Sequence, residues 1–89
     1  MKISREKRNK ISEQILAHLF ALNFKPAFTS NIAKEIARDE EFTKGVLKDL
    51  LKKGLVLEIK KNQEGILYLR RSRWILSKPA HEAYIKYQN

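Results

Sequence analysis

The chain has 89 residues, 43% of them apolar, with 19 Lys or Arg against 10 Asp or Glu and a formal net charge of +9. This length indicates a single domain over residues 1–89, and the apolar fraction is too high for a disordered chain. The sequence contains no Cys, which excludes disulfides, thiolate zinc sites and cysteine nucleophiles. No apolar run reaches the roughly 20 residues of a membrane span, and no apolar segment follows the basic start. We therefore expect a cytoplasmic protein.

The positive charge is concentrated toward the two ends of the sequence. Residues 1–24 hold five basic and two acidic side chains, residues 25–59 hold seven and six, and residues 60–89 hold seven and two. Such a distribution favours a polyanionic partner, with nucleic acid first and an acidic membrane surface second. The alternative is that the lysines only keep a small domain soluble.

The first predicted element is a helix over about residues 5–22. Ile11, Ile15, Leu19 and Leu22 recur at helical intervals, and Asn23 is suited to end the helix in a left-handed conformation. Residues 1–10 are charged almost throughout. They form either a basic N-terminal arm or the first turns of this helix.

Residues 24–28 alternate apolar and polar side chains around Pro26, a pattern typical of a short extended connector or an edge strand. Thr29 or Ser30 then offers a hydroxyl cap for a second helix over about residues 30–37.

A third helix is predicted over about residues 40–53. Asp39 precedes it as an N-cap, and Gly54 follows it as a C-terminal stop. Val46, Leu47, Leu50 and Leu51 form its apolar stripe, and Lys44, Lys48 and Lys52 form a basic one.

After Gly54 the period changes to two, which predicts strands over about residues 55–61 and 66–76 joined by a turn. Leu55, Leu57 and Ile59 should share one face, with Glu58 and Lys60 on the other. Pro79 then indicates a last helix over about residues 78–88. The predicted fold is mainly α with a small β-hairpin, an α+β domain.

Two helices across a tight turn, followed by a hairpin, form a helix-turn-helix with a wing. Three segments resemble the MarR-like and related small prokaryotic transcription regulators: the Ile32-Ala33 step with Ile36, the run from Leu47 to Val56, and the run from Trp74 to Pro79. The resemblance implies a winged helix-turn-helix fold, double-stranded DNA as the partner, homodimerisation through the terminal helices, and location at the nucleoid.

The sequence departs from the family pattern at the start of the third helix. Thr43 stands where the family has an apolar residue facing the second helix. Either Thr43 is half-buried, or the turn is longer and Phe42 points inward. The acidic residues Asp39, Glu40 and Glu41 also stand where phosphates normally approach, although Glu can accept a hydrogen bond from cytosine N4.

The candidate DNA-binding residues lie at the start of the second helix, on the third helix and in the basic wing. They are Thr29, Ser30, Asn31, Glu41, Thr43, Lys44, Lys48, Lys60, Lys61, Asn62, Gln63, Arg70, Arg71 and Arg73. Each group has a structural alternative: helix capping for the hydroxyls, and protection of a sheet edge for the wing charges. Gly45 marks either a close approach of another backbone or a tolerated weak point in the helix.

No nucleophile is paired with a base, and two histidines are too few for a metal site by themselves. We therefore expect neither catalysis nor a metal or other cofactor. Three functions are consistent with this sequence. The first is a DNA-binding transcription regulator, the second a protein-interaction module in a transcription or replication assembly, and the third an RNA-binding or chromosome-coating protein.

Overall fold

The computed structural model describes residues 4–60 and 72–88. In chain order its elements are α1 (Arg5–Ala21), β1 (Ala27–Phe28), α2 (Thr29–Glu35), α3 (Glu40–Lys52), β2 (Val56–Ile59), β3 (Arg73–Leu76) and α4 (Lys78–Gln88). The four predicted helices are confirmed to within two residues at each end. Within the described residues, the two predicted wing strands are shorter than expected. Residues 61–71 lie outside this description.

The helix ends follow the local chemistry. Ser4 caps α1 by accepting a hydrogen bond from the Lys7 amide, so residues 5–10 are helical. Asn23 ends α1 with a φ of 51°, and Gly54 follows α3 with a φ of 75°. Both residue types tolerate this left-handed conformation, so both predicted stops are confirmed.

The sheet has three antiparallel strands in the order β1-β3-β2. The segment after Pro26 is thus an edge strand, and it pairs with β3 through Ala27 opposite Trp74. In the other pair, Val56 lies opposite Leu76 and Glu58 lies opposite Trp74. The central strand is therefore β3, with Trp74 at its middle.

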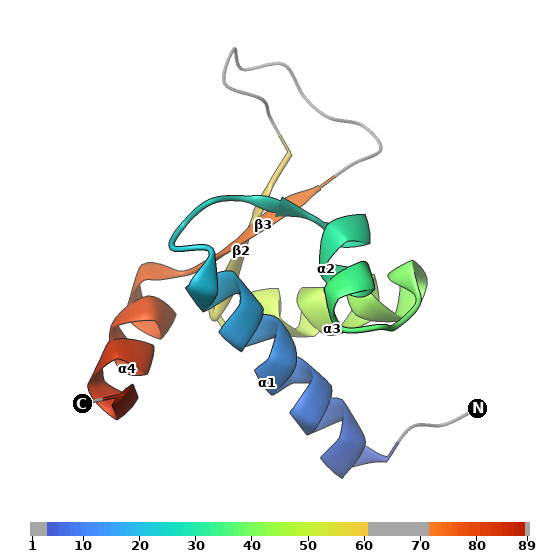
Figure 1. Cartoon of the computed structure of the whole chain (residues 1–89), viewed down its shortest axis with the longest axis horizontal. Coiled ribbons are helices and arrows are strands. Elements are labelled where there is room, and N and C mark those ends of the chain that lie inside the picture. Colours follow the sequence, from blue (N-terminus) through green and yellow to red (C-terminus); the bar gives the residue numbers. More distant parts are fainter. Residues whose placement is uncertain (1–3, 61–71, 89) are drawn as a thin grey trace.

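The core is formed where α1 crosses α3 and the sheet (Figure 1). From α1 it contains Ile11, Ile15 and Leu19, and from the sheet it contains Trp74 and Leu76, all 2% exposed or less. Figure 1 shows α4 on the far side of α1 from α2 and α3. The paired helices α2 and α3 are thus free to present their outer surfaces on one side of the molecule.

One predicted strand face is reversed. Val56 is fully buried and the Glu58 side chain is only 8% exposed, whereas Leu57 is 47% exposed. The period of two is correct, but the inward face is that of Val56 and Glu58. The cause is pairing with β3, since Val56 and Glu58 lie opposite the buried Leu76 and Trp74.

Candidate nucleic-acid interface

The start of α2 is fixed to the centre of the sheet by one buried hydrogen bond. Trp74 Nε1 donates to Thr29 Oγ1 at 2.8 Å, and Thr29 is only 7% exposed. The residue at the N-cap position is Phe28, which makes no side-chain capping hydrogen bond. The prediction that Thr29 or Ser30 caps the helix is therefore wrong. Thr29 is also too buried to contact a phosphate, so it leaves the set of candidate DNA-binding residues.

The start of α3 is held by Asp39, as the sequence predicts. The Asp39 carboxylate accepts from the Phe42 amide at 2.8 Å, and the Asp39 carbonyl accepts from Thr43 Oγ1 at 2.8 Å. Thr43 is completely buried, with its hydroxyl satisfied within the helix. Of the two alternatives at this turn, Thr43 is the inward residue, so it too leaves the candidate set. Phe42 is half-buried beside it, with the Arg8 guanidinium 5.6 Å from its ring centroid.

The outer surface of α3 presents both acidic and basic groups. Glu40 and Glu41 lie exposed in its first turn. Lys44 is exposed one turn further along. The surface is therefore acidic at the start of α3 and basic in its middle. The helix dipole favours negative charge at the N-terminal end. Lys44 is the only cation in the first two turns of α3.

Lys48, one turn beyond Lys44, is held by the chain itself. Its Nζ donates to Glu58 Oε1 at 3.2 Å and to Oε2 at 3.4 Å, and lies 6.0 Å from the Trp74 ring centroid. Burial raises the pKa of Glu58, but the hydrogen bonds from Ser72 and Lys48 outweigh burial, so the pKa lies below its usual value. Glu58 is thus an ionised, almost buried group that joins α3 to β2 and β3.

Sequence reasoning missed this network because it placed Glu58 on the outer face of its strand. The signal that identifies it is the register with β3, in which Glu58 lies opposite Trp74. Register is a tertiary property of two segments that are separated by the wing tip. The alternation within one strand does not contain it.

The other candidates occupy three places. Ser30 and Asn31 are exposed in the first turn of α2, which packs against α3. Lys60 is exposed directly after β2, and Arg73 is half-buried in β3 opposite Ile59. The predicted wing-tip residues Lys61, Asn62, Gln63, Arg70 and Arg71 lie outside the described residues.

Within residues 4–60 and 72–88, no helix has both the length and the apolar character needed to cross a bilayer. In the same ranges, no three His, Asp or Glu side chains are grouped so that they could hold a metal ion.

The fold has counterparts among solved structures. A mutant of MepR from S. aureus matches with a TM-score of 0.71 and 19% identity over 88% of this chain and 54% of that one. A ZitR mutant from Lactococcus lactis in the apo form matches with a TM-score of 0.64 and 16% identity over 93% of this chain. A second MepR mutant matches with a TM-score of 0.64 and 20% identity over 96% of this chain.

The chain spans 54% to 60% of the length of these similar structures. No protein-family model matches it, and no curated protein matches it. MepR and ZitR are winged-helix transcription regulators of the MarR family. At these identities the similarity is one of fold, and the chain therefore has the winged-helix fold seen in these MarR-type regulators.

Proposed function

We propose that this protein is a transcription regulator that binds double-stranded DNA with α3 in the major groove. The observation that carries the proposal is the free cation on the outer surface of α3. Lys44 is exposed and, within the described part of the chain, has no ion-pair partner. The helix is presented by a winged-helix fold in a chain of net charge +9. A cation projecting from such a helix is suited to guanine O6 and N7.

The remaining surface of α2 and α3 supplies complementary groups. Ser30 and Asn31 are exposed hydroxyl and amide donors at the start of α2, where phosphates are commonly bound. Glu41 is exposed on α3 and is an acceptor for cytosine N4. Lys48 is half-buried and bound to Glu58. It therefore joins the interface only when DNA competes with that carboxylate.

The wing supplies the phosphate contacts in this proposal. Lys60 and Arg73 belong to it within the described residues, and Lys61, Asn62, Gln63, Arg70 and Arg71 belong to it by sequence. Arginine in this position reads the negative potential of a narrow minor groove. The phosphate contacts hold any sequence with similar strength and contribute affinity, whereas an arginine in the minor groove favours AT-rich sequences, whose groove is narrow.

The test is a fluorescence-anisotropy titration of the full chain at two salt concentrations, with duplex DNA, single-stranded DNA and RNA as probes. We expect duplex to bind most tightly, with an affinity that falls steeply as salt rises. A selected duplex that outcompetes random duplex identifies a regulator. Equal affinity for all three probes would instead indicate a chromosome-coating or RNA-binding protein.

We further infer that the protein acts as a homodimer through α1 and α4. On α4, Ile85 is 44% and Tyr87 is 92% exposed, and Phe24 in the turn after α1 is 42% exposed. Figure 1 shows this end of the molecule away from α2 and α3. A two-fold pair formed here leaves both copies of α3 free for half-sites about one turn apart. Sedimentation velocity at micromolar concentration decides the point, because a monomer mass throughout removes the two-fold arrangement.

A second candidate function is a protein-interaction module. The exposed Asp39, Glu40 and Glu41 at the start of α3 favour it, because carboxylates there repel phosphates and attract a basic protein surface. Absence of duplex binding even at low salt, in a folded sample, would support this function over the first.

A further inference from the structure

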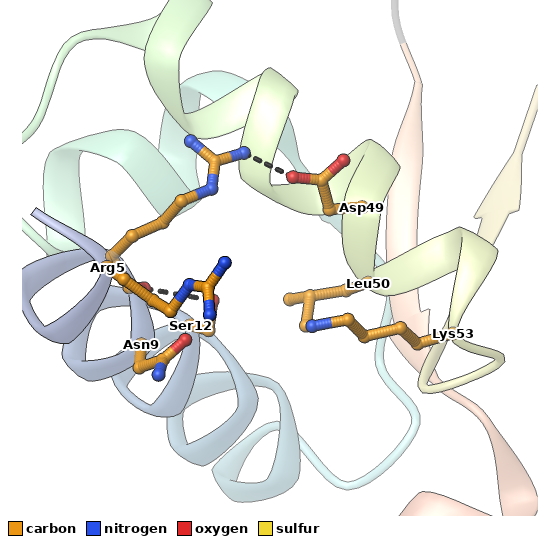
Figure 2. A pocket seen from close by; sticks show the side chains of 7 residues that line it. Arg5, Asn9, Ser12, Asp49, Leu50 and Lys53 are labelled. Atoms are coloured by element: carbon orange, nitrogen blue, oxygen red, sulfur yellow. Dashed lines mark hydrogen bonds and ion pairs between the residues drawn. The ribbon is translucent and has the colours of Figure 1, made fainter. Parts of the chain in front are cut away.

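A polar groove separates the first half of α1 from the second half of α3 (Figure 2). Its volume is about 460 Å³, which is within the range of small-molecule sites, roughly 300–1,000 Å³. Its lining residues are Arg5, Arg8, Asn9, Ser12, Asp49, Leu50 and Lys53. Leu50, which is 2% exposed, is the apolar part of the lining. Figure 2 shows the side chain of Lys53, the C-cap residue of α3, extending toward α1 across the groove.

The groove does not coincide with the proposed DNA surface of α3. Lys53 follows Lys44 by nine positions, which is two and a half turns at about 3.6 residues per turn. The two lysines therefore project from opposite sides of the helix. A duplex that contacts Lys44 leaves Lys53 facing α1.

The lining carries an excess of positive charge. Three cations, Arg5, Arg8 and Lys53, are opposed by the single carboxylate of Asp49, which forms an ion pair with Arg8. The hydrogen bond from Arg8 is the main cause that lowers the pKa of Asp49, against a smaller opposing effect of burial, so this carboxyl is ionised at neutral pH. In the ranges that the structure covers, neither Arg5 nor Lys53 forms an ion pair.

Of the neutral lining residues, Asn9 can also contact an anion, and Ser12 orders the helix turn beside it. The Asn9 side chain brings an amide donor. Ser12 Oγ donates to the Arg8 carbonyl at 3.0 Å, which orders the helix turn that carries Arg8. Two unpaired cations, an amide donor and a third cation shared with one carboxylate form an environment for a ligand with two or three negatively charged oxygens.

We propose that this α1–α3 groove binds a small oxyanion, a phosphate or carboxylate group, with Arg5 and Lys53 as its charge partners. Arg8 becomes a third partner when it releases the Asp49 carboxylate and pairs with the ligand instead. The site is independent of the DNA-binding function proposed above, because its binding can be measured without DNA.

The test is an NMR titration of ¹⁵N-labelled full-length protein with inorganic phosphate, in which chloride is withdrawn to keep the ionic strength constant. We expect saturable shifts of the Asn9, Ser12 and Leu50 amides. Arg5→Ala and Lys53→Ala should each weaken phosphate binding by about threefold or more, as for partly exposed ion pairs. The matched controls are Lys7→Ala on α1 and Lys34→Ala on α2, which remove the same charge at exposed positions outside the lining and should leave the binding unchanged.

Asp49→Asn is expected to strengthen phosphate binding, whereas Arg5→Ala and Lys53→Ala weaken it. It removes the competing charge and keeps the side-chain shape, so phosphate binding should tighten by about threefold. Absence of saturable shifts in the wild type would overturn the site, and so would equal weakening by all four alanine variants. Unchanged or weaker binding by Asp49→Asn, in a sample with wild-type circular dichroism, would overturn the shared role of Arg8.

A duplex titration of the same variants identifies the source of the oxyanion. If Arg5→Ala and Lys53→Ala leave duplex affinity unchanged while weakening phosphate binding, the ligand is a free anion. If each lowers duplex affinity and reduces the salt slope by about one contact, the groove receives a backbone phosphate. Both outcomes support an oxyanion site and differ only in its natural occupant.

Discussion

Lys48 on α3 and Glu58 on β2 form an ion pair, with Nζ 3.2 Å from Oε1. The lysine side chain is 43% exposed, but the carboxylate is only 8% exposed and also accepts a hydrogen bond from Ser72. The pair therefore fixes α3 to the base of the wing through a carboxylate that is almost removed from water. It also separates the two central lysines of α3 into a structural one, Lys48, and a free one, Lys44.

Because Lys44 is free and Lys48 is not, the first prediction concerns the recognition of DNA bases by Lys44. Lys44→Ala should weaken binding to the cognate duplex more than to random duplex, because a lysine on guanine discriminates by about 1–3 kcal/mol. Lys52→Ala is the control. It should lower both affinities equally and slightly, since a phosphate contact is lost on any sequence. Equal loss on both duplexes with Lys44→Ala would show that this lysine does not read bases. No change on either would place Lys44 outside the groove and favour the interaction module.

The second prediction concerns acid stability. The pKa of Glu58 is lowered in the folded chain, so the group contributes stability above its unfolded pKa of about 4.3. That contribution is lost as the pH falls through the lower folded value. Glu58→Gln should therefore cost about 1 kcal/mol at pH 7 and flatten the loss of stability below about pH 4.3. Urea unfolding from pH 7 to pH 3 measures both effects. Glu82→Gln, on the exposed surface of α4, is the control and should keep the wild-type pH profile.

The third prediction tests the hydrogen bond that anchors α2. Thr29→Val keeps the side-chain shape but leaves the buried Trp74 N–H without its acceptor, so it should cost about 1–3 kcal/mol. Thr29→Ser keeps the hydroxyl and should cost less. In a Trp74→Phe background, Thr29→Val should be nearly neutral, because the unsatisfied donor is gone. The measurement is the free energy of chemical unfolding of Thr29→Val, Thr29→Ser, Trp74→Phe and the double variant Thr29→Val/Trp74→Phe. A full Thr29→Val penalty in the Phe background would mean that packing is the cause.

The fourth prediction compares two glycines, Gly45 and Gly54. Both have room for a side chain, but their backbone conformations differ. A Cβ added to Gly45 or Gly54 meets no atom within 4 Å, but only Gly54 has a positive φ, of 75°. Gly45→Ala should therefore stabilise the protein by about 1 kcal/mol through helix propensity. Gly54→Ala should destabilise it by about 1 kcal/mol through the left-handed conformation. Thermal unfolding tests both predictions, since the melting temperature should rise for Gly45→Ala and fall for Gly54→Ala. A stable Gly45→Ala variant that loses duplex affinity would show that DNA approaches α3 closely at this position.

The sequence by itself determined the local features of the fold. Helix periodicity located all four helices, and the chemistry of Asp39, Asn23 and Gly54 gave their correct ends. These features depend on interactions within a few residues, so the order of side chains along the chain contains them. The same is true of the overall layout, because a helix-turn-helix followed by strands is a consequence of that order.

Only the tertiary structure decided the inward positions that side-chain polarity did not indicate. Thr43 is buried because α3 packs against the core on that side, although its hydroxyl alone suited a groove contact equally well. Glu58 is inward because β2 pairs with β3 in a register that places it opposite Trp74. The groove between α1 and α3 depends on Arg8 and Asp49, which are 41 positions apart. Such contacts depend on strand register and helix crossing, which join distant segments, and no local pattern specifies them.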